Sequence, residues 1–234
     1  MTIFGYVKKF ILIFLKYASL VFFSLVAVIP LVSCVITAFK PDAEYNSTNV
    51  MTPPSSWMYF DNFISAFNKA GMGRAFINST VILVVVLILS VFIGTQLAYV
   101  LNRFEFFGNT LIRNLFLIAC QLPGVAMQIA VYEMMYKLGF INNMFGYILM
   151  TCGTDVISIY IYIQFFENID YSLDESAIMD GASYFTIFYK ILLPLLKPAI
   201  VTACILKGVG TYNEYYNANL YLQDKKRYAT VATS

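Results

Sequence analysis

Two long stretches without a charged residue constrain this chain more than any other feature of its sequence. Tyr17 to Phe39 is 23 residues long and Ala75 to Asn102 is 28 residues long, and neither contains Asp, Glu, Lys or Arg. A helix needs about 20 apolar residues to cross the hydrocarbon core of a bilayer. We therefore expect each stretch to form a membrane-spanning helix.

The composition of the chain agrees with a membrane protein. Apolar residues make up 60% of the sequence and charged residues 12%, against about 45–50% and about 25% in soluble domains. A soluble enzyme of this composition would expose large apolar patches. The net charge of +2 is too small for a nucleic-acid-binding protein. The lack of His excludes histidine-based zinc sites and Ser-His-Asp triads, and the four isolated cysteines predict no metal site.

Three further stretches are apolar enough to span a bilayer, although each contains an interruption or a charge. Proline and glycine are tolerated in membrane helices when neighbours satisfy the freed backbone groups. The predicted fold is an all-α, polytopic transmembrane helical bundle of five spans that forms a single domain over residues 1–234. The three additional spans are Asn114 to Tyr132 with Pro123 and Gly124 inside, about Met144 to Phe166 with Asp155 inside, and about Lys197 to Tyr216 with Lys207 and Glu214 inside.

Two segments outside these spans have recognisable patterns. Residues 1–16 are basic, and we expect a cytoplasmic N-terminal segment rather than a signal peptide, because the apolar run that follows is too long for one. Without the C-terminal tail, seven basic residues against four favour a cytoplasmic N-terminus under the positive-inside rule. In the polar segment 41–73, helical spacing of large apolar residues predicts an amphipathic helix: Trp57, Phe60, Phe63, Ile64 and Phe67.

The polar segment 167–196, between the fourth and fifth expected spans, predicts a helix, a bend and a second helix. Ser172 and Glu175 have the spacing of a capping box at a helix N-terminus. Gly181 stands where a left-handed residue would end this first helix. Two prolines, Pro194 and Pro198, would close the segment and start the next span. The second helix would place five apolar side chains on one face: Tyr184, Phe185, Phe188, Ile191 and Leu192.

The spacing in this loop resembles the EAA loop of permease subunits of binding-protein-dependent ABC importers. That loop reads E-A-A-x3-G-x9-I-x-L-P, and this chain has Glu175-Ser176-Ala177, then Gly181, then Ile191-Leu192-Leu193-Pro194 at the same intervals. Only Ser176 departs from the pattern. Four other stretches resemble the carbohydrate-uptake branch of the family, second-subunit type, as in maltose and multiple-sugar permeases: Phe76 to Ser79, Leu97 to Tyr99, Thr154-Asp155 and Asp180 to Ser183.

The resemblance implies a type I, MetI-like importer permease in a bacterial plasma membrane, with segment 167–196 as its cytoplasmic coupling loop. Such a permease translocates a sugar or oligosaccharide that an extracellular binding protein delivers. The implied partners are a homologous second permease subunit, forming a heterodimer, and a cytoplasmic ATPase dimer. This chain has no G-x-x-x-x-G-K-[ST] motif, so it would not be an enzyme, and the ATPase would bind ATP and Mg²⁺. The implied coupling residues are Glu175, Ser176, Ala177, Asp180, Gly181, Ile191, Leu193 and Pro194.

Ionisable residues inside the expected spans are candidates for the translocation pathway, because each costs about 2.5–3.5 kcal/mol at a helix centre. Two interpretations of Asp155 and Lys207 stay open: they line the pathway, or they form a structural pair or contact the partner subunit. Glu214 and Asn213 lie in a cluster of aromatic and amide residues. That cluster suits sugar recognition at the outer mouth and also an interfacial aromatic belt; we favour the belt.

Members of the family resemble one another in having six spans with both termini in the cytoplasm. Five are expected here, and Ser234 falls before a sixth, so we expect the chain to be C-terminally incomplete. One alternative is therefore an inactive truncated fragment, and another is an ABC permease for a non-sugar solute. A third is an ion-coupled secondary carrier with Asp155, Lys207 and Glu214 as a charge relay, but it leaves the loop around Gly181 unexplained.

Overall fold

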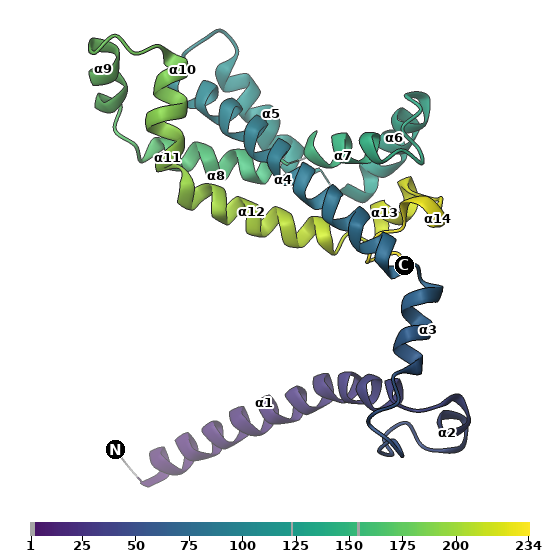
Figure 1. Cartoon of the computed structure of the whole chain (residues 1–234). Helices are drawn as coiled ribbons and strands as arrows, with labels where there is room; N and C mark the ends of the chain where they lie inside the picture. The colour runs from purple at the N-terminus through teal and green to yellow at the C-terminus, as the bar shows by residue number, and fades with distance from the viewer. Residues whose placement is uncertain (1–2, 123, 154) are drawn as a thin grey trace. The chain divides into compact units, whose positions relative to one another are not determined.

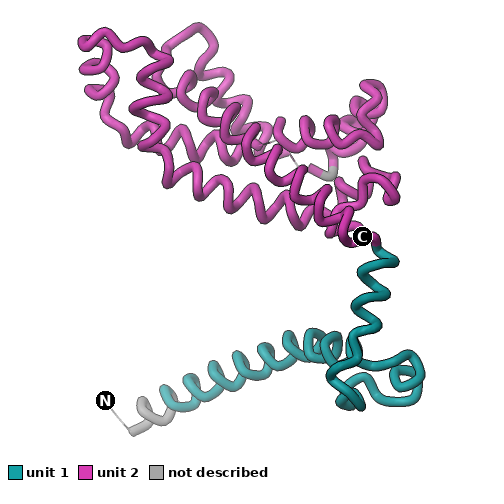
Figure 2. Tube along the Cα trace, in the orientation of Figure 1, with its two compact units in different colours: residues 1–70 teal, residues 71–234 magenta. Residues whose placement is uncertain are grey.

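The computed structural model describes residues 3–122, 124–153 and 155–234, and the regular secondary structure in these ranges is all helical. The chain divides into two compact units, Met1–Ala70 and Gly71–Ser234 (Figure 2). The first unit contains α1 (Ile3–Ala38), α2 (Asp42–Ser47) and α3 (Asp61–Lys69). The second begins with α4 (Met72–Arg103), α5 (Asn109–Gln121), α6 (Gly124–Lys137), α7 (Met144–Gly153) and α8 (Val156–Glu167). It continues with α9 (Ser172–Met179), α10 (Tyr184–Thr186), the π-helix η1 (Ile187–Leu192), α11 (Leu193–Leu195), α12 (Lys197–Tyr212), α13 (Tyr216–Tyr221) and α14 (Lys225–Tyr228).

Helix α1 contains the first expected span and extends it toward the N-terminus. Pro30 lies inside this helix. Residues 9–32 are all exposed, so the rest of the first unit does not bury this part of α1. Exposed apolar side chains of this kind are more stable in contact with lipid than with water. The run from Lys9 to Ala38 is long and apolar enough to cross a membrane.

The polar segment after α1 is folded around a buried lysine. Lys40 is 1% exposed, and its Nζ donates hydrogen bonds to Thr48 Oγ1 (2.9 Å) and to the Asn49 carbonyl (2.8 Å). The Asn62 side-chain amide donates to the carbonyls of Ala38 (3.0 Å) and Lys40 (2.7 Å). The two Asn62 bonds join the end of α1 to the start of α3.

The expected amphipathic helix is confirmed as α3, but only in part. Phe63, Ile64 and Phe67 lie in α3, whereas Trp57 and Phe60 precede its first residue. The rings of Trp57, Phe60 and Phe63 surround Phe39, with centroid separations of 5.2–5.8 Å. The large residues of this segment therefore form an aromatic cluster within the first unit.

Helix α4 is the central helix of the second unit and confirms the second expected span. It packs against α7, α8 and α12 (Figure 1). Small residues allow membrane helices to approach closely, and the buried stripe of α4 includes Ala75, Ser90, Gly94 and Ala98. At Gly94 helix α4 lies close to α8, because a Cβ there would lie 3.0 Å from the Tyr162 ring.

The third expected span is a pair of inclined helices. Helices α5 and α6 lie at 109° to each other, with Leu122 extended between them (φ −71°, ψ 127°). A residue before a proline is driven out of the α-helical region, which explains this conformation. Pro123 itself lies outside the described residues, and Gly124 begins α6. The stretch from Asn114 to Tyr132 is therefore not one straight helix; its bend fits a broken span or a re-entrant loop.

The fourth expected span contains a bend, whereas the fifth follows one and is covered by α12 from Lys197 to Tyr212. Helices α7 and α8 are inclined by 43°, and Asp155 is the N-cap residue of α8; Thr154 lies outside the described residues. The helical segment Tyr184–Leu195 and α12 are inclined by 71°, and Pro198 lies in the first turn of α12. In the described part of the chain, α1 and α4 qualify as single spans, and the count reaches five when each bent pair is one span.

We predict that Gly94→Leu destabilises the packing of α4 on α8. The added side chain would collide with the Tyr162 ring, and overpacking costs about 1–3 kcal/mol. Thermal unfolding in detergent should show a lower midpoint for this variant. The matched control is Gly73→Leu in the first turn of the same helix, where an added Cβ meets nothing within 4 Å. Equal midpoints for the two variants would contradict the prediction.

Candidate functional site

The segment between α8 and α12 forms the predicted helix, bend and second helix, but its first helix starts differently. Tyr171, not Ser172, is the N-cap residue of α9, and no side chain caps it. The Asp170 carboxylate accepts a hydrogen bond from the Ser172 backbone N–H (2.9 Å). The predicted capping box of Ser172 and Glu175 is therefore wrong, because Asp170 turns the chain two residues earlier. Hydrogen bonds from the backbone and side chain of Ser172 hold the pKa of Asp170 below its usual value.

Gly181 ends α9, as predicted, in the left-handed conformation (φ +81°). Its N–H donates to the Ile178 carbonyl (2.9 Å), and the Ala182 N–H donates to the Ala177 carbonyl (2.9 Å). These two bonds make a Schellman motif, which satisfies carbonyls that the helix end would leave unpaired. Since left-handed backbone is strained for most other residues, glycine fixes the direction of the chain after α9.

The two faces of α9 differ in exposure. Asp174 and Ala177 are buried against their own chain, whereas Glu175, Ser176 and Asp180 are exposed. Three large apolar residues add to the exposed surface: Leu173, Ile178 and Met179. From the motif that resembles an EAA loop, α9 therefore presents Glu175 and Ser176 outward, while Ala177 packs inward.

Two residues that the sequence motif does not mark lie at the base of α9. Arg103 is the last residue of α4, and its Nη2 lies 3.3 Å from Asp174 Oδ2, with the two side chains 8% and 4% exposed. The same Nη2 donates to the Ile169 carbonyl (2.8 Å). The guanidinium carbon lies 5.4 Å from the centroid of the Tyr171 ring. Burial raises the pKa of Asp174, and the charge of Arg103 opposes that rise.

The second arm of the loop departs from regular α-helical geometry. The Leu193 N–H, just after the π-helix η1, donates to the Phe188 carbonyl, five residues back. The wider turn moves the apolar face: Phe188 and Leu192 are buried, but Tyr184 and Phe185 are exposed. The predicted single face is therefore wrong for Tyr184 and Phe185, because it assumed α-helical spacing throughout.

The remaining motif residues lie along this second arm. Ile191 and Leu193 are half-buried, and Pro194 is exposed in α11. Proline has no N–H to donate and clashes with the preceding turn of an α-helix, and the π-helix ends two residues before it. The arm then bends at Leu196 into α12. The two prolines thus close the loop and begin the next helix, as predicted.

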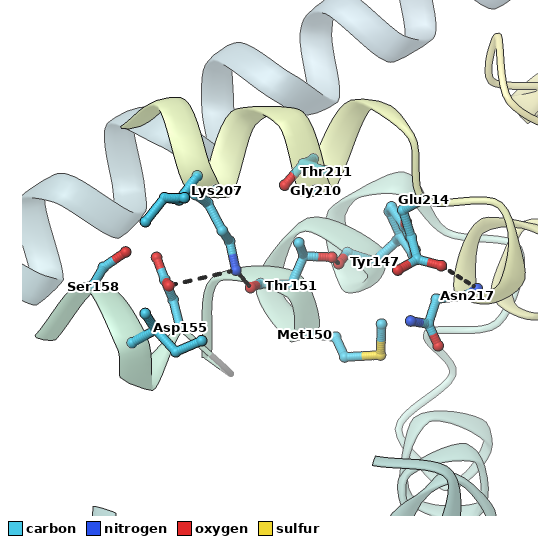
Figure 3. A pocket seen from close by; sticks show the side chains of 12 residues that line it. Tyr147, Met150, Thr151, Asp155, Ser158, Lys207, Gly210, Thr211, Glu214 and Asn217 are labelled. Atoms are coloured by element: carbon cyan, nitrogen blue, oxygen red, sulfur yellow. Dashed lines mark hydrogen bonds and ion pairs between the residues drawn. The ribbon is translucent and has the colours of Figure 1, made fainter. Parts of the chain in front are cut away.

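A polar cavity of about 310 Å³ lies between α7, α8, α12 and the start of α13 (Figure 3). It brings together three of the four residues expected in the translocation pathway, Asp155, Lys207 and Glu214. Asn213 is not among its lining residues; its side-chain amide donates to the Val209 carbonyl (3.0 Å). The polar lining groups come from helices far apart in sequence.

Lys207 connects two sides of the cavity. Its Nζ lies 4.0 Å from Asp155 Oδ1 and donates to the Thr151 carbonyl at 2.8 Å (Figure 3). Thr151 belongs to the last turn of α7, where carbonyls lack partners within the helix and a cation is favourable. Lys207 therefore supports the break between α7 and α8. It is at once a structural pair with Asp155 and part of the cavity wall.

Some oxygen atoms of the residues that line the cavity are paired, and others are buried without a partner. Glu214 Oε1 accepts from the Asn217 N–H (3.0 Å), while Asp155 Oδ2 and Thr211 Oγ1 are buried without a hydrogen-bond partner among the described residues. Buried polar atoms are ordinarily paired. Asp155 and Glu214 contribute carboxylate groups to the cavity lining, and carboxylates accept hydrogen bonds from hydroxyl groups.

We predict that Lys207→Met lowers the free energy of unfolding in detergent by about 3 kcal/mol, because breaking a buried pair leaves one charge uncompensated. Adding Asp155→Asn to Lys207→Met should recover part of the loss. The matched control is Lys137→Met in the exposed Lys137–Glu133 pair (3.3 Å, 71% and 66% exposed), which should change stability by less than about 1 kcal/mol. Equal losses in the two single variants would disprove the structural role of Lys207.

Residues 90–224 match the family described as binding-protein-dependent transport system inner membrane component. This range is more than half of the chain, and it contains both the loop and the residues that line the cavity. The fold is similar to that of a bacterial ABC transporter involved in the import of the acidic polysaccharide alginate. The TM-score is 0.79 over 96% of this chain and 79% of that chain, at 23% identity.

The relatives in sequence are permease proteins. The chain is 27% identical to the diacetylchitobiose uptake system permease protein NgcG of Streptomyces coelicolor, over 86% of this chain and 66% of that protein. It is 32% identical to the probable ABC transporter permease protein YurM of Bacillus subtilis (84% and 65%). It is 30% identical to the melibiose/raffinose/stachyose import permease protein MelC of Bacillus subtilis (85% and 71%). It thus spans less than two thirds of the first two relatives. The chain belongs to the inner membrane components of binding-protein-dependent transport systems, the permeases of ABC importers.

Proposed function

We propose that this chain is the permease subunit of an ATP-driven importer for a sugar or oligosaccharide. The observation that carries the proposal is α9, a short helix on an elbow between two apolar segments, with Glu175 and Ser176 on its exposed face. Family membership supports it. The names of relatives add support for the solute class, since they include permeases for diacetylchitobiose, melibiose and maltodextrin.

In this proposal α9 docks into a cytoplasmic ATPase subunit, which binds ATP and Mg²⁺ and carries out the hydrolysis, so this chain is not itself an enzyme. Glu175 supplies an exposed carboxylate for a basic partner, and the small side chain of Ser176 permits close approach. Asp180 lies at the exposed end of the helix, and Gly181 sets the turn. Ile191, Leu193 and Pro194 lie in the second arm, through which motion of the elbow reaches α12.

The cavity between α7, α8 and α12 is the proposed contact with the solute. Carboxylate oxygens accept hydrogen bonds from sugar hydroxyls, and Asp155 and Glu214 both line this cavity. Lys207 holds Asp155 in place from the opposite wall. Asn213 lies outside the cavity, and the proposal places it at the outer mouth. A homologous second permease would complete the pathway, and an extracellular binding protein would deliver the sugar.

We predict MgATP-dependent uptake by the intact complex, purified through a tag on this chain and reconstituted into lipid vesicles. The probes are radiolabelled melibiose, diacetylchitobiose and maltodextrin, with an amino acid mixture as the contrast. Uptake of at least one sugar should require MgATP and survive an uncoupler. Uptake of amino acids alone would disprove the solute class. Uptake that survives ATP depletion but collapses with the uncoupler would favour an ion-coupled carrier.

We predict that Gly181→Val abolishes this uptake while the chain still inserts into the membrane. Valine at φ +81° is strained by about 1–2 kcal/mol, which would displace the second arm from α9. The matched control is Gly139→Val, since Gly139 also has a positive φ (+71°) but lies outside the loop. Normal uptake by Gly181→Val would remove the coupling role of the elbow.

A further inference from the structure

The coupling helix α9 is attached to the central helix α4 by a buried ion pair. Arg103 Nη2 lies 3.3 Å from Asp174 Oδ2, and both side chains are nearly inaccessible, at 8% and 4% exposed. Arg103 ends α4, whereas Asp174 lies on the inward face of α9. The pair therefore joins two elements that are separated in sequence by α5 to α8.

Stability alone is a poor explanation for this pair. Removing two charges from water is costly, and apolar residues of similar size often serve equally well. The neighbouring pair of Arg113 and Glu167 shows the ordinary alternative: its atoms lie 2.8 Å apart, but its side chains are 34% and 52% exposed. An exposed pair of that kind contributes little. What the buried pair adds is a defined geometry.

Arg103 holds the start of α9 at three points. Beyond Asp174, its guanidinium donates to the Ile169 carbonyl (2.8 Å) and lies over the Tyr171 ring (5.4 Å to the centroid). The planar guanidinium presents its donors in a rigid fork. Contacts at positions 169, 171 and 174 thus fix both the place and the rotation of α9 relative to the end of α4.

Aromatic rings attach the second arm of the elbow to the same end of α4. Phe104, which follows Arg103, has its ring centroid 5.2 Å from that of Tyr184. Tyr99, one turn earlier, has its ring 5.0 Å from Phe188 in the π-helix and 5.9 Å from Phe166 in α8. Both arms of the elbow therefore pack on the C-terminal end of α4 and on Phe104, which follows it.

We propose that Arg103 and Asp174 form a latch through which α9 and α4 move as one rigid body. The proposal rests on the proposed function, in which an ATPase displaces α9. The latch carries that displacement straight to the central helix, in addition to the covalent route through the second arm. Arg103 and Asp174 are positioning residues, because they act through α9 and contact neither solute nor nucleotide.

The test measures the separation of α9 and α4 by electron paramagnetic resonance on the purified complex. Spin labels are placed at Met179→Cys on α9 and Ile88→Cys on α4, both exposed positions, after replacement of the four native cysteines. Distances are recorded without nucleotide and after trapping with MgATP and vanadate. With the latch intact, the distance distribution should be narrow and the same in both states.

The variants Arg103→Gln and Asp174→Asn each remove one charge and keep a polar side chain; Asn has the shape of Asp, whereas Gln is shorter than Arg. In both variants, the distribution of distances between the two spin labels should broaden, and trapping with MgATP and vanadate should shift it. Sugar taken up per ATP hydrolysed, measured with whichever probe sugar the unaltered complex imports, should fall at least about fivefold, the lower end of typical coupling between sites. Arg103→Lys, which keeps the charge, should recover part of this loss. Arg113→Gln, which breaks the exposed pair, is the matched control and should behave like the unaltered complex.

Several outcomes would overturn the latch. One is an unchanged, narrow distribution in both charge-removing variants. Another is loss of the ATPase subunit from Arg103→Gln while Asp174→Asn assembles with normal uptake per ATP, since the pair would then serve assembly alone. If the unaltered complex shows no ATP-dependent uptake, the proposed function fails, whereas the nucleotide-free distances still decide whether Arg103 holds α9 on α4.

Discussion

The hydrocarbon core of a bilayer offers no hydrogen-bond partner to a backbone amide, so every backbone group of a span must be satisfied within the protein. Helices α1 and α4 meet this requirement because each is one continuous helix, in which the backbone groups bond to each other. Two of the bent pairs meet it through hydrogen bonds at their breaks. At the α7–α8 break, Lys207 donates to the Thr151 carbonyl. At Leu196, backbone bonds on both sides continue through the bend, from Leu196 N to Leu192 O and from Ile200 N to Leu196 O. The polar cavity follows from the first of these solutions, because the groups that support the break also line it.

The arrangement of the loop follows from a different requirement, which is to hold a small helix outside the apolar bundle in a fixed orientation. A helix of eight residues is too short to be stable alone. Here it is ended by the Schellman turn at Gly181 and held at its start by Arg103 and Asp170. The side chains on its exposed face are therefore not needed to hold the helix in place. Glu175 and Ser176 can then contact another protein without any change in how α9 is held.

The parts of this fold that could be predicted from sequence are those that depend on local chemistry. Uncharged runs predict α1 and α4, because hydrocarbon thickness sets the length of a span. Gly181 could be predicted as a left-handed residue because it follows the predicted helix start at Ser172 by the length of one short helix. The bend at Leu122 follows from the proline after it, although its angle of 109° does not. Angles depend on the helices that pack on either side.

The failures have equally specific causes. The capping box was wrong because Asp170 competes for the Ser172 N–H from two residues away. The apolar face of the second arm was wrong because a π-helix changes the angular spacing. The contact of Arg103 with Asp174 joins residues 71 positions apart, and only tertiary structure brings them together. Asn213 shares a sequence cluster with Glu214, yet its side chain binds its own helix and lies outside the cavity.

The π-helix has one more consequence, for how this arm responds to changes in length. An α-helix advances about 100° per residue, and the wide turn between Ile187 and Leu192 accommodates an extra residue without a break in the backbone hydrogen bonds. Deleting a single residue there would therefore return the arm to ordinary α-helical winding at nearly constant length. The parts of the arm on either side of that turn would keep nearly the same orientation about its axis, because the wide turn already contains the extra residue within one revolution. The extra residue of this turn therefore shifts by one position which side chains of the arm face the bundle.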